Sequence, residues 1–500
     1  MNFNPPTKAE LYKKLRETVK KYHPNADLDL LDLTFEFADK AHENQLRASG
    51  ALYITHPLQA AITLAEMKVN LPIIQAALLH DVPEDTSKTI NEIKKEFGAD
   101  IAGMVAGITK LGKIKYRGIE RYIENLRKMF IAMASDIRVV FIKFADRLHN
   151  LETIDYLPAA KRYRIALETL EIYAPIANRL GIGEMKGRLE DLAFKYVYPK
   201  EYEWTTSLIK ESYSKKFASL EAAIAQSKIF LPKEGVEAVS VHGRQKHVYS
   251  LYKKLVSKDR DISKIYDVLA VRIIVKDLAD CYATLGIIHK YWKPLKGRIK
   301  DYIAQPKPNG YRSLHTTVFY DDGEIIEVQI RTQEMHEEAE YGIVAHWRYD
   351  EAGKKSIVGR EIEWMQELAK IQKEFETKKQ FLEGLEALKI DVFKNHIFVF
   401  TPQGDVIDLP EDATPVDFAY AIHSDIGDQC VGAVINEQIA TLDTALKNGD
   451  VIHIITNKDR KSPSSDWLKF IKTRGAKQKI KAKLNAQSSG IIKKLMGGGK

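Results

Sequence analysis

The feature that most constrains the fold is a change of periodicity near Tyr266. From residue 8 to about residue 195, apolar side chains recur at helical spacing, which predicts an all-α region. Beyond Tyr266, β-branched and aromatic runs at 268–275, 316–320 and 324–330 predict strands of a mixed sheet flanked by helices. Asp321-Asp322-Gly323 lies between the last two runs and predicts a hairpin turn. The chain is therefore expected to be multidomain.

A third region is indicated after residue 390. With 500 residues the chain is long enough for roughly three domains. Residues 360–385 have a charged helical periodicity that predicts a connecting helix between lobes. A strand and turn at 396–405, a short helix at 416–423 and a closing strand at 449–455 then predict a small α+β module.

Composition limits the cellular setting. The longest apolar runs fall far short of the roughly 20 residues that cross a bilayer, and the first residues lack the layout of a secretory signal. Cys281 and Cys430 are the two cysteines, too few for a disulfide framework or a cysteine-rich zinc site. We therefore expect a cytoplasmic protein.

Positive charge is concentrated at the end of the chain. The formal net charge is +8, and residues 457–500 contain 13 Lys/Arg against 2 Asp/Glu. Either a solvated or disordered basic end, or a segment that faces RNA, accounts for this pattern.

Two histidines and two aspartates form the first candidate site. His56 precedes Pro57 and is predicted to cap a helix over 57–68, while His80-Asp81 follows the apolar helix expected at 71–79. Asp146 adds a second carboxylate. Such an N/O ligand set suits manganese, iron or zinc rather than calcium. Each histidine taken singly is more often an ordinary polar residue than a ligand.

These residues stand in motifs that resemble HD-type phosphohydrolases. More narrowly, Tyr53-Ile54-Thr55-His56-Pro57, Glu84-Asp85-Thr86 and the stretch from Lys143 to Arg147 resemble the hydrolase domain of long RelA/SpoT homologues. The resemblance implies that His56, His80, Asp81 and Asp146 hold Mn²⁺, which activates water against the 3′-pyrophosphate of (p)ppGpp.

The resemblance also implies supporting roles around this metal. Glu84 and Asp85 would position or deprotonate the water, although Pro83 means that Glu84 need not lie one helical turn beyond His80. Arg47 and Asn150 match positions that hold the guanosine part. An α-helical domain with a structural or inactive metal site is the alternative.

Two carboxylates on neighbouring strands form the second candidate site. Asp267 opens one expected strand and Glu327 lies in another, so the pair can share Mg²⁺ bridging triphosphate oxygens. Basic residues accompany them: Arg244, Lys246, Arg272, Arg298, Lys300 and Lys307. This set suits phosphoryl transfer. A Walker-type loop and the protein-kinase signatures are absent from the sequence.

Five separated blocks then resemble the synthetase domain of RelA/SpoT homologues, with a nucleotidyltransferase-like mixed sheet. They begin at Gly243, Tyr266, Lys300, Asn309 and Glu327, and the stretch from Ala339 to Trp347 completes them. The resemblance implies transfer of the β,γ-pyrophosphate of ATP to the 3′-hydroxyl of GDP or GTP.

The resemblance assigns a role to each matching residue. Asp267 and Glu327 would bind Mg²⁺, and Glu327 would help to deprotonate the 3′-hydroxyl. The implied nucleotide contacts are Arg244 on adenine, Lys246, Arg272 and Lys300 on phosphates, Tyr311 on guanine, and His315 and Lys307 on the acceptor nucleotide or its phosphates. Tyr311 and His315 could instead pack in the core. The basic stretch Arg298-Ile299-Lys300-Asp301 matches the version that accompanies enzymes with both activities.

Residues of about 391–456 resemble the TGS domain, a small β-grasp module. Thr414 to Gly427 is its most telling stretch, and His423 matches a histidine that meets the 3′ end of uncharged tRNA on the ribosome. A helix-end histidine without a partner is the alternative. The zinc-finger-like and ACT-type domains of full-length members do not follow in the printed sequence.

Together these observations predict a bifunctional (p)ppGpp synthetase/hydrolase of the RelA/SpoT type, acting in the stringent response. The expected parts are an HD-type hydrolase domain (1–200), a synthetase domain (201–350), a helical linker (351–388), a TGS domain (389–457) and the basic start of a following helical region (458–500). Two alternatives remain: a hydrolase-only enzyme, and a tRNA- or ribosome-binding sensor with vestigial catalysis.

Overall fold

A computed structural model describes residues 6–112, 135–345 and 396–485, apart from positions 308, 322, 404–405, 448–449, 458, 461 and 474, together with residues 128, 129 and 132. The chain divides into two compact units, Met1–Glu374 and Phe375–Lys500. We call residues 6–198 the helical region, 199–345 the sheet region and 396–485 the C-terminal module. The connecting helix expected at 360–385 and the linker at 351–388 lie outside the described residues.

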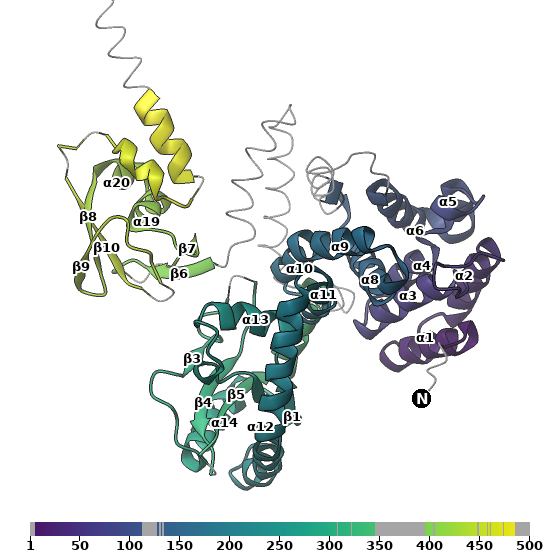
Figure 1. Ribbon diagram of the computed structural model, residues 1–500, viewed down its shortest axis with the longest axis horizontal. Coiled ribbons are helices and arrows are strands. Elements are labelled where there is room, and N and C mark those ends of the chain that lie inside the picture. The colour runs from purple at the N-terminus through teal and green to yellow at the C-terminus, as the bar shows by residue number, and fades with distance from the viewer. Residues whose placement is uncertain are drawn as a thin grey trace, which may run out of the picture. The chain divides into compact units, whose positions relative to one another are not determined.

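The helical region is all-α in its described residues, as its periodicity predicts (Figure 1). Its α-helices are α1 (Lys8–Tyr22), α2 (Leu28–Ala41), α3 (Thr55–Glu66), α4 (Leu71–Leu79), α5 (Val82–Asp85), α6 (Ile90–Gly112), α8 (Arg138–Glu152), α9 (Ala159–Glu168), α10 (Ala174–Arg179) and α11 (Gly183–Val197). A 3₁₀ turn, Ile154–Tyr156, follows α8, and a π-helical turn, Thr169–Tyr173, joins α9 to α10.

Helices α3 and α4 form the centre of this region. Every residue from Leu71 to Leu79 except Pro72 is buried, as are most residues of α3. A helix that is apolar all round cannot face water on any side, so its neighbours must surround it. Helix α3 accordingly packs against α1, α4 and α8, which brings His56, His80 and Asp146 to one place.

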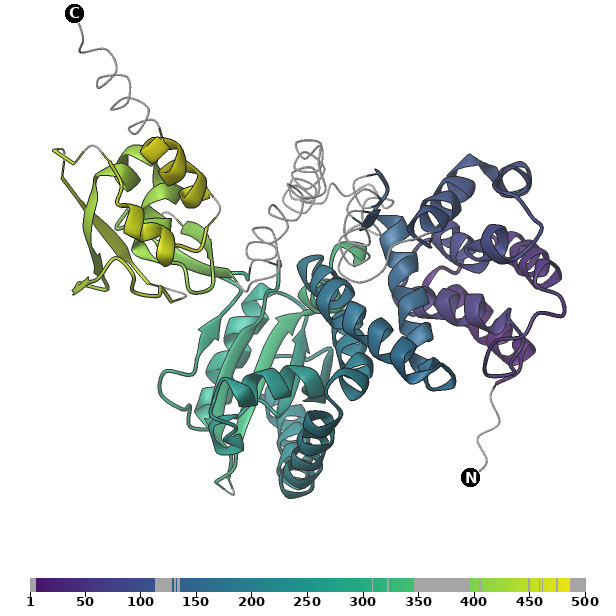
Figure 2. The ribbon, with the colours of Figure 1, turned by 45° about the horizontal axis from the view of Figure 1, so that its top comes forward.

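The sheet region combines a five-stranded mixed sheet with long helices (Figure 2). Its elements are α12 (Pro199–Lys233), β1 (Ser240–Gln245), α13 (Val248–Val256), a 3₁₀ turn (Ile262–Lys264), β2 (Leu269–Val275), α14 (Leu278–Tyr291), β3 (Lys300–Asp301), β4 (Leu314–Phe319), β5 (Ile325–Thr332) and α15 (Gln333–Tyr341). The strand order is β1-β2-β5-β4-β3, in which only β2 and β5 run parallel. The hairpin expected between β4 and β5 is present, with Gly323 at φ 84°.

Alternation along the strands gives the sheet one apolar and one polar face. Side chains at i and i+2 share a face of a strand. On β2 and β5, Val271, Ile273 and Val328 join the core that α12 and α14 complete. The strand pairing therefore places the intervening residues on the opposite face: Arg244, Arg272, Lys300, His315, Glu327, Gln329 and Arg331. That polar face carries the candidate site.

The C-terminal module is a small α+β fold. It contains β6 (His396–Phe400), β7 (Val406–Pro410), α19 (Pro415–Ile422), α20 (Ser424–Gln429), β8 (Cys430–Ile435), β9 (Gln438–Ala440), β10 (Ile452–Thr456) and a 3₁₀ turn (Ser465–Lys469). A parallel bridge between Phe400 and Val451 links the β6–β7 pair to the β10-β8-β9 sheet.

The basic segment after residue 457 packs on this module. Trp467, Ile471 and Ile480 share a core with Val416 and Tyr420. The buried carboxylate of Asp417 accepts hydrogen bonds from the backbone N–H groups of Lys472 and Thr473 at 2.7–3.1 Å. Residues 464–485, as far as they are described, are therefore part of the module's packing.

No helix in the described parts of the chain is long and apolar enough to cross a membrane. Cys281 and Cys430 are both buried free thiols, and burial raises the pKa of each.

Candidate active sites

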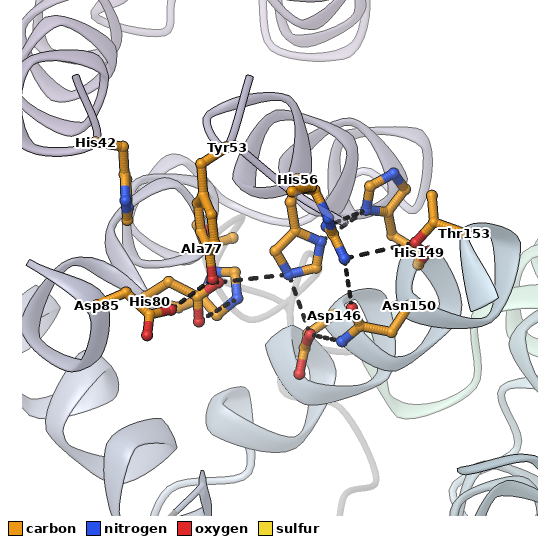
Figure 3. Close-up of polar contacts among 12 residues, drawn as sticks. His42, Tyr53, His56, Ala77, His80, Asp85, Asp146, His149, Asn150 and Thr153 are labelled. Atoms are coloured by element: carbon orange, nitrogen blue, oxygen red, sulfur yellow. Dashed lines mark hydrogen bonds and ion pairs between the residues drawn. The ribbon is translucent and has the colours of Figure 1, made fainter. Parts of the chain in front are cut away.

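The helical region contains a buried cluster suited to a metal ion. Ligand atoms of His56, His80 and Asp146 all lie within 4.8 Å of one another. Asp81 flanks them: its Oδ1 is 3.2 Å from His80 Nε2 and its Oδ2 is 3.5 Å from His56 Nε2. The structure thus brings all four expected metal ligands together, and Figure 3 labels three of them, His56, His80 and Asp146.

A hydrogen bond orients the imidazole of His80 toward this cluster. His80 Nδ1 lies 2.7 Å from the carbonyl oxygen of Ala77, so it is the nitrogen that donates, and Nε2 keeps its lone pair. His80 Nε2 is buried and has no hydrogen-bond partner in the described residues. An orphaned buried acceptor beside carboxylates fits a cation, and His56, His80, Asp81 and Asp146 are the residues that can hold it.

The helix start at His56 differs from the expectation. Helix α3 begins at Thr55, with Ile54 at the N-cap position, and no side chain caps it. His56 therefore does not cap the helix. Its imidazole points inward because α3 is buried on nearly all sides, and Pro57 is accommodated in the first turn, where no intrahelical N–H bond is required.

Pro83 starts a new helical turn. It stands in the first turn of α5, and the backbone N–H groups of Glu84 and Asp85 both donate to the carbonyl of Asp81, at 3.1 and 2.9 Å. The chain thus turns at His80-Asp81, and the acidic pair stays beside the metal ligands. Tyr53, which the sequence singled out only as part of a motif, joins the acidic pair to the metal ligands. Its hydroxyl is 2.5 Å from Asp85 Oδ2 and 3.0 Å from Asp81 Oδ2.

A basic cavity of about 320 Å³ adjoins Asp146. Arg47 and Asn150, both expected at the guanosine, line it and are joined by a hydrogen bond of 2.9 Å. Its other cationic lining residues are Lys143, Arg147, Lys161 and Arg164. A cavity with this lining suits an anionic nucleotide held next to the metal ligands.

Electrostatics separate the roles of the carboxylates. Burial alone would raise the pKa of Asp146, but the Lys143 ammonium at 2.6 Å holds this pKa well below its usual range. Asp146 is therefore a permanent anion. By contrast, partial desolvation raises the pKa of Glu84, and Asp81 and Asp85 add to this rise while Lys143 opposes it. A carboxylate with a raised pKa is the better proton acceptor.

The second cluster lies at the polar face of the sheet, where Asp267 stands two residues before β2 (Leu269–Val275) and does not open this strand as expected. Lys246 and Lys254 lie 2.6 and 2.7 Å from Asp267 Oδ2. Burial would raise the pKa of Asp267, but the two lysines bring this pKa far below its usual range. Asp267 Oδ1 is buried without a hydrogen-bond partner in the described residues, so one oxygen of this carboxylate can take a metal ion. Lys254 was not anticipated from the sequence.

Glu327 stands at the end of a hydrogen-bonded chain on the same face. His315 Nδ1 is 3.2 Å from Glu327 Oε1, and the Tyr311 hydroxyl is 2.8 Å from His315 Nε2. The hydroxyl donates to Nε2 and the Nδ1–H group donates to the carboxylate. Gln329 also donates to Glu327 Oε1, at 2.8 Å. Tyr311 and His315 therefore make polar contacts on this face of the sheet.

The remaining expected residues of this site surround the same face. Arg244, Arg272 and Tyr311 line a cavity of about 300 Å³, whose other wall comes from α10 and α11 of the helical region, including Lys186. Arg331, which was also not anticipated, lines this cavity and shares Glu340 with Arg272. An alternating pattern of charged and apolar residues along β5 is the sequence signal that could have identified Arg331.

Lys300 in β3 and Lys307, which lies between β3 and β4, complete the set. Lys300 pairs with His315 in the β3–β4 ladder. The Lys307 ammonium lies 4.6 Å from the centre of the Tyr302 ring and 5.0 Å from that of Tyr311. Loss of hydration there, together with the positive charges of Lys300 and Lys246, lowers the pKa of Lys307 to about 8.

His423 lies in the C-terminal module, at the junction of α19 and α20. Its side chain is exposed, and Nδ1 accepts a hydrogen bond of 3.2 Å from the backbone N–H of Asp425. The histidine thus caps α20, and its remaining ring atoms face solvent.

Three family models match the chain: an HD domain over residues 34–183, the region found in RelA / SpoT proteins over 243–354 and a TGS domain over 397–456. The first match falls within the helical region, the second begins in the sheet region and the third falls within the C-terminal module.

Several curated proteins match nearly the whole chain. A GTP pyrophosphokinase of Myxococcus xanthus is 45% identical over 94% of this chain and 62% of its own length. A guanosine-3′,5′-bis(diphosphate) 3′-pyrophosphohydrolase of Aquifex aeolicus is 44% identical over 96% and 68%. The bifunctional (p)ppGpp synthase/hydrolase SpoT of Escherichia coli is 43% identical over 94% and 67%. The chain thus spans about three fifths to two thirds of the relatives it matches, and this likeness over almost all of its residues shows that it belongs to the RelA/SpoT family.

Proposed function

We propose that this chain both makes and hydrolyses (p)ppGpp. The observation that carries the proposal is that both expected sets of metal ligands come together, each beside a basic cavity. These sets are His56/His80/Asp81/Asp146 and Asp267/Glu327. An inactive domain would have no reason to keep orphaned acceptors such as His80 Nε2 and Asp267 Oδ1 buried at both places. The names of the three relatives cover both activities.

Hydrolysis is assigned to the helical region. We infer that His56, His80, Asp81 and Asp146 would hold Mn²⁺, which would lower the pKa of a water molecule and polarise the 3′-pyrophosphate. Glu84 is the residue that takes the proton from this water, because its pKa is raised and it lies on the turn after Asp81. Asp85 and Tyr53 hold this turn in place through their hydrogen bond. Arg47 and Asn150 bind the guanosine part.

Synthesis is assigned to the polar face of the sheet. Asp267 and Glu327 would hold Mg²⁺, which neutralises the triphosphate of ATP. Glu327 takes up the proton of the 3′-hydroxyl of GDP or GTP. His315 bonds to this carboxylate and links it to Tyr311, whose ring is available for guanine. Arg244 contacts adenine, whereas Lys246, Arg272, Lys300 and Lys307 contact phosphates.

The C-terminal module provides the third part of the proposal. The exposed ring of His423 and the lysines packed beside α19 and α20 suit the end of an uncharged tRNA on the ribosome. Domain limits at 1–200, 201–350, 351–388, 389–457 and 458–500 accompany this assignment, as does a cytoplasmic location, where ATP and GTP are available.

One pair of assays tests the central proposal. Purified protein is incubated with ATP and GDP under Mg²⁺, and separately with ppGpp under Mn²⁺, and the nucleotides are resolved by anion exchange. We expect ppGpp and AMP in the first tube, and GDP and pyrophosphate in the second. Product only in the second tube would indicate a hydrolase-only enzyme. Product in neither tube would leave a binding protein with vestigial sites.

A further inference from the structure

His149 is a buried residue that none of the functional assignments above uses. Its Nδ1 is 2.6 Å from Nδ1 of His56, and the two rings are stacked with centroids 4.9 Å apart. The same nitrogen is 3.2 Å from Nη1 of Arg47. Figure 3 shows His149 beside His56, on the side away from His80. One nitrogen of His149 therefore faces two neighbours.

The chemistry of Arg47 decides which groups donate. A guanidinium can only donate hydrogen bonds, since it has no acceptor and does not lose its proton in proteins. His149 Nδ1 must therefore accept. A nitrogen that accepts from Arg47 carries no proton, so the hydrogen bond between the two histidines is donated by His56 Nδ1.

The opposite arrangement is unfavourable. If His149 Nδ1 carried the proton, it would point at the N–H groups of Arg47 across 3.2 Å, and two donors would face each other. His56 is thus left with Nε2 toward the carboxylates, 3.2 Å from Asp146 Oδ1 and 3.5 Å from Asp81 Oδ2. This is the nitrogen that a metal ion needs.

Arg47 also reaches the other side of the cluster. Its Nη2 donates to Asn150 Oδ1 at 2.9 Å, and Asn150 Nδ2 donates to Asp146 Oδ1 at 2.5 Å. The carbonyl oxygen of the amide faces the guanidinium, and the NH₂ group faces the carboxylate. One guanidinium therefore orients a histidine ligand through His149 and an aspartate ligand through Asn150.

The two histidine ligands are fixed in different ways. His80 is held by the backbone carbonyl of Ala77, which no substitution removes. His56 is held by a side chain whose own orientation depends on Arg47. We propose that His149 is a positioning residue of the metal site, and that Arg47 fixes His56 in the metal-binding tautomer through it. The proposal rests on the proposed metal-dependent hydrolysis, but it predicts metal affinity in the absence of nucleotide.

The test measures Mn²⁺ binding by electron paramagnetic resonance without any nucleotide. His149→Phe removes the acceptor, and we expect the affinity of the site to fall by about 10- to 100-fold, as for other partners of metal-bound histidines. His149→Asn keeps an acceptor oxygen near the position of Nδ1 and should restore affinity to within about threefold of wild type. His289→Phe, which removes a histidine of the sheet region bonded to Thr316, should leave Mn²⁺ affinity unchanged.

Arg47→Met gives the sharper result. A residue that only contacts guanosine would not affect the binding of Mn²⁺ alone, whereas the proposal requires a loss of about tenfold. Wild-type affinity in both His149→Phe and Arg47→Met would overturn the proposal. Absence of Mn²⁺ binding, or of ppGpp hydrolysis, in the wild type would instead contradict the proposed function.

A measurement on the wild type covers the case in which a variant does not fold. Long-range ¹H–¹⁵N spectra of protein labelled at histidine distinguish the two tautomers of a neutral imidazole. We expect a proton on Nδ1 of His56 and none on Nδ1 of His149. A proton on His149 Nδ1 would overturn the proposal.

Discussion

The two carboxylate clusters of this chain are neutralised by the protein to different extents. In the helical region, Asp81 and Asp146 face imidazole nitrogens, and acceptor atoms point at one another. In the sheet region, two lysines lie against Asp267, and His315 and Gln329 donate to Glu327. In the first cluster the protein cation Lys143 lies on one oxygen of Asp146, and no described cation lies between the imidazole nitrogens and the remaining carboxylate oxygens; in the second cluster two lysines share one oxygen of Asp267.

This difference indicates when each metal binds. A cluster of converging acceptors gains from a divalent ion before any substrate arrives. At Asp267, by contrast, an incoming ion competes with Lys246 and Lys254, which the phosphates of a nucleotide would draw away. We therefore expect Mn²⁺ to be a resident ion of the hydrolase site and Mg²⁺ to enter the synthetase site together with ATP.

The largest effects should come from a reciprocal pair of substitutions. Asp146→Asn removes one metal ligand and should lower hydrolysis by about 10³-fold or more, because the activated water is lost. Asp267→Asn should lower synthesis by a similar factor through loss of the nucleotide-bound metal. Each variant should retain the other activity, measured with the two assays described above. A loss of both activities from either change would show that the clusters are not independent.

Glu84 offers the next effect, and it depends on pH. Glu84→Gln should lower hydrolysis by about 10²- to 10⁴-fold, the range for loss of a general base. In the wild type the base must be ionised, so hydrolysis falls as pH drops through the pKa of Glu84. Because this pKa is raised, the acid limb of kcat/KM should lie at higher pH than for an ordinary glutamate.

Synthesis provides the control for this pH dependence. Asp267 has a pKa far below its usual range, so its ionisation should produce no acid limb in the working range. An acid limb at the same pH in both reactions would mean that Glu84 does not cause it.

Much of this arrangement could be predicted from the sequence, because motifs report which residues meet. The helix over 71–79 and the strand carrying Glu327 were predicted from periodicity, and α4 coincides with its prediction, whereas Asp267 lies two residues before β2 and does not open it. Periodicity could not show that α3 begins before His56, because a buried helix start needs no capping residue. Periodicity also could not show that Lys254, which belongs to another element, contacts Asp267. Nor could it show the role of His149, which depends on which of two histidines donates a hydrogen bond.

Lys254 therefore gives a direct test of the protein-cation explanation. In the Asp146→Asn background, which removes the hydrolase site from the measurement, Lys254→Met should strengthen nucleotide-free Mn²⁺ binding at Asp267 by roughly twofold to fivefold. The physical reason is that one of two competing ammonium groups has gone. Lys253→Met is the matched control, since Lys253 is bonded to Glu190 instead. Equal or weaker binding in Lys254→Met would contradict the explanation.

The smallest effect concerns Lys307 and again separates the two sites by pH. The pKa of Lys307 is lowered to about 8, so its ammonium is lost as pH rises through this value in the free enzyme. If this charge holds a phosphate of the acceptor nucleotide, kcat/KM for synthesis should decline above about pH 8 while hydrolysis does not. Lys307→Arg keeps its charge to roughly pH 12, so the decline should move beyond the measurable range with little change in the plateau. A decline that stays near pH 8 in Lys307→Arg would assign the ionisation to another group. In the wild type, the decline should be absent from kcat, because the phosphates of bound nucleotide raise the pKa of a neighbouring ammonium.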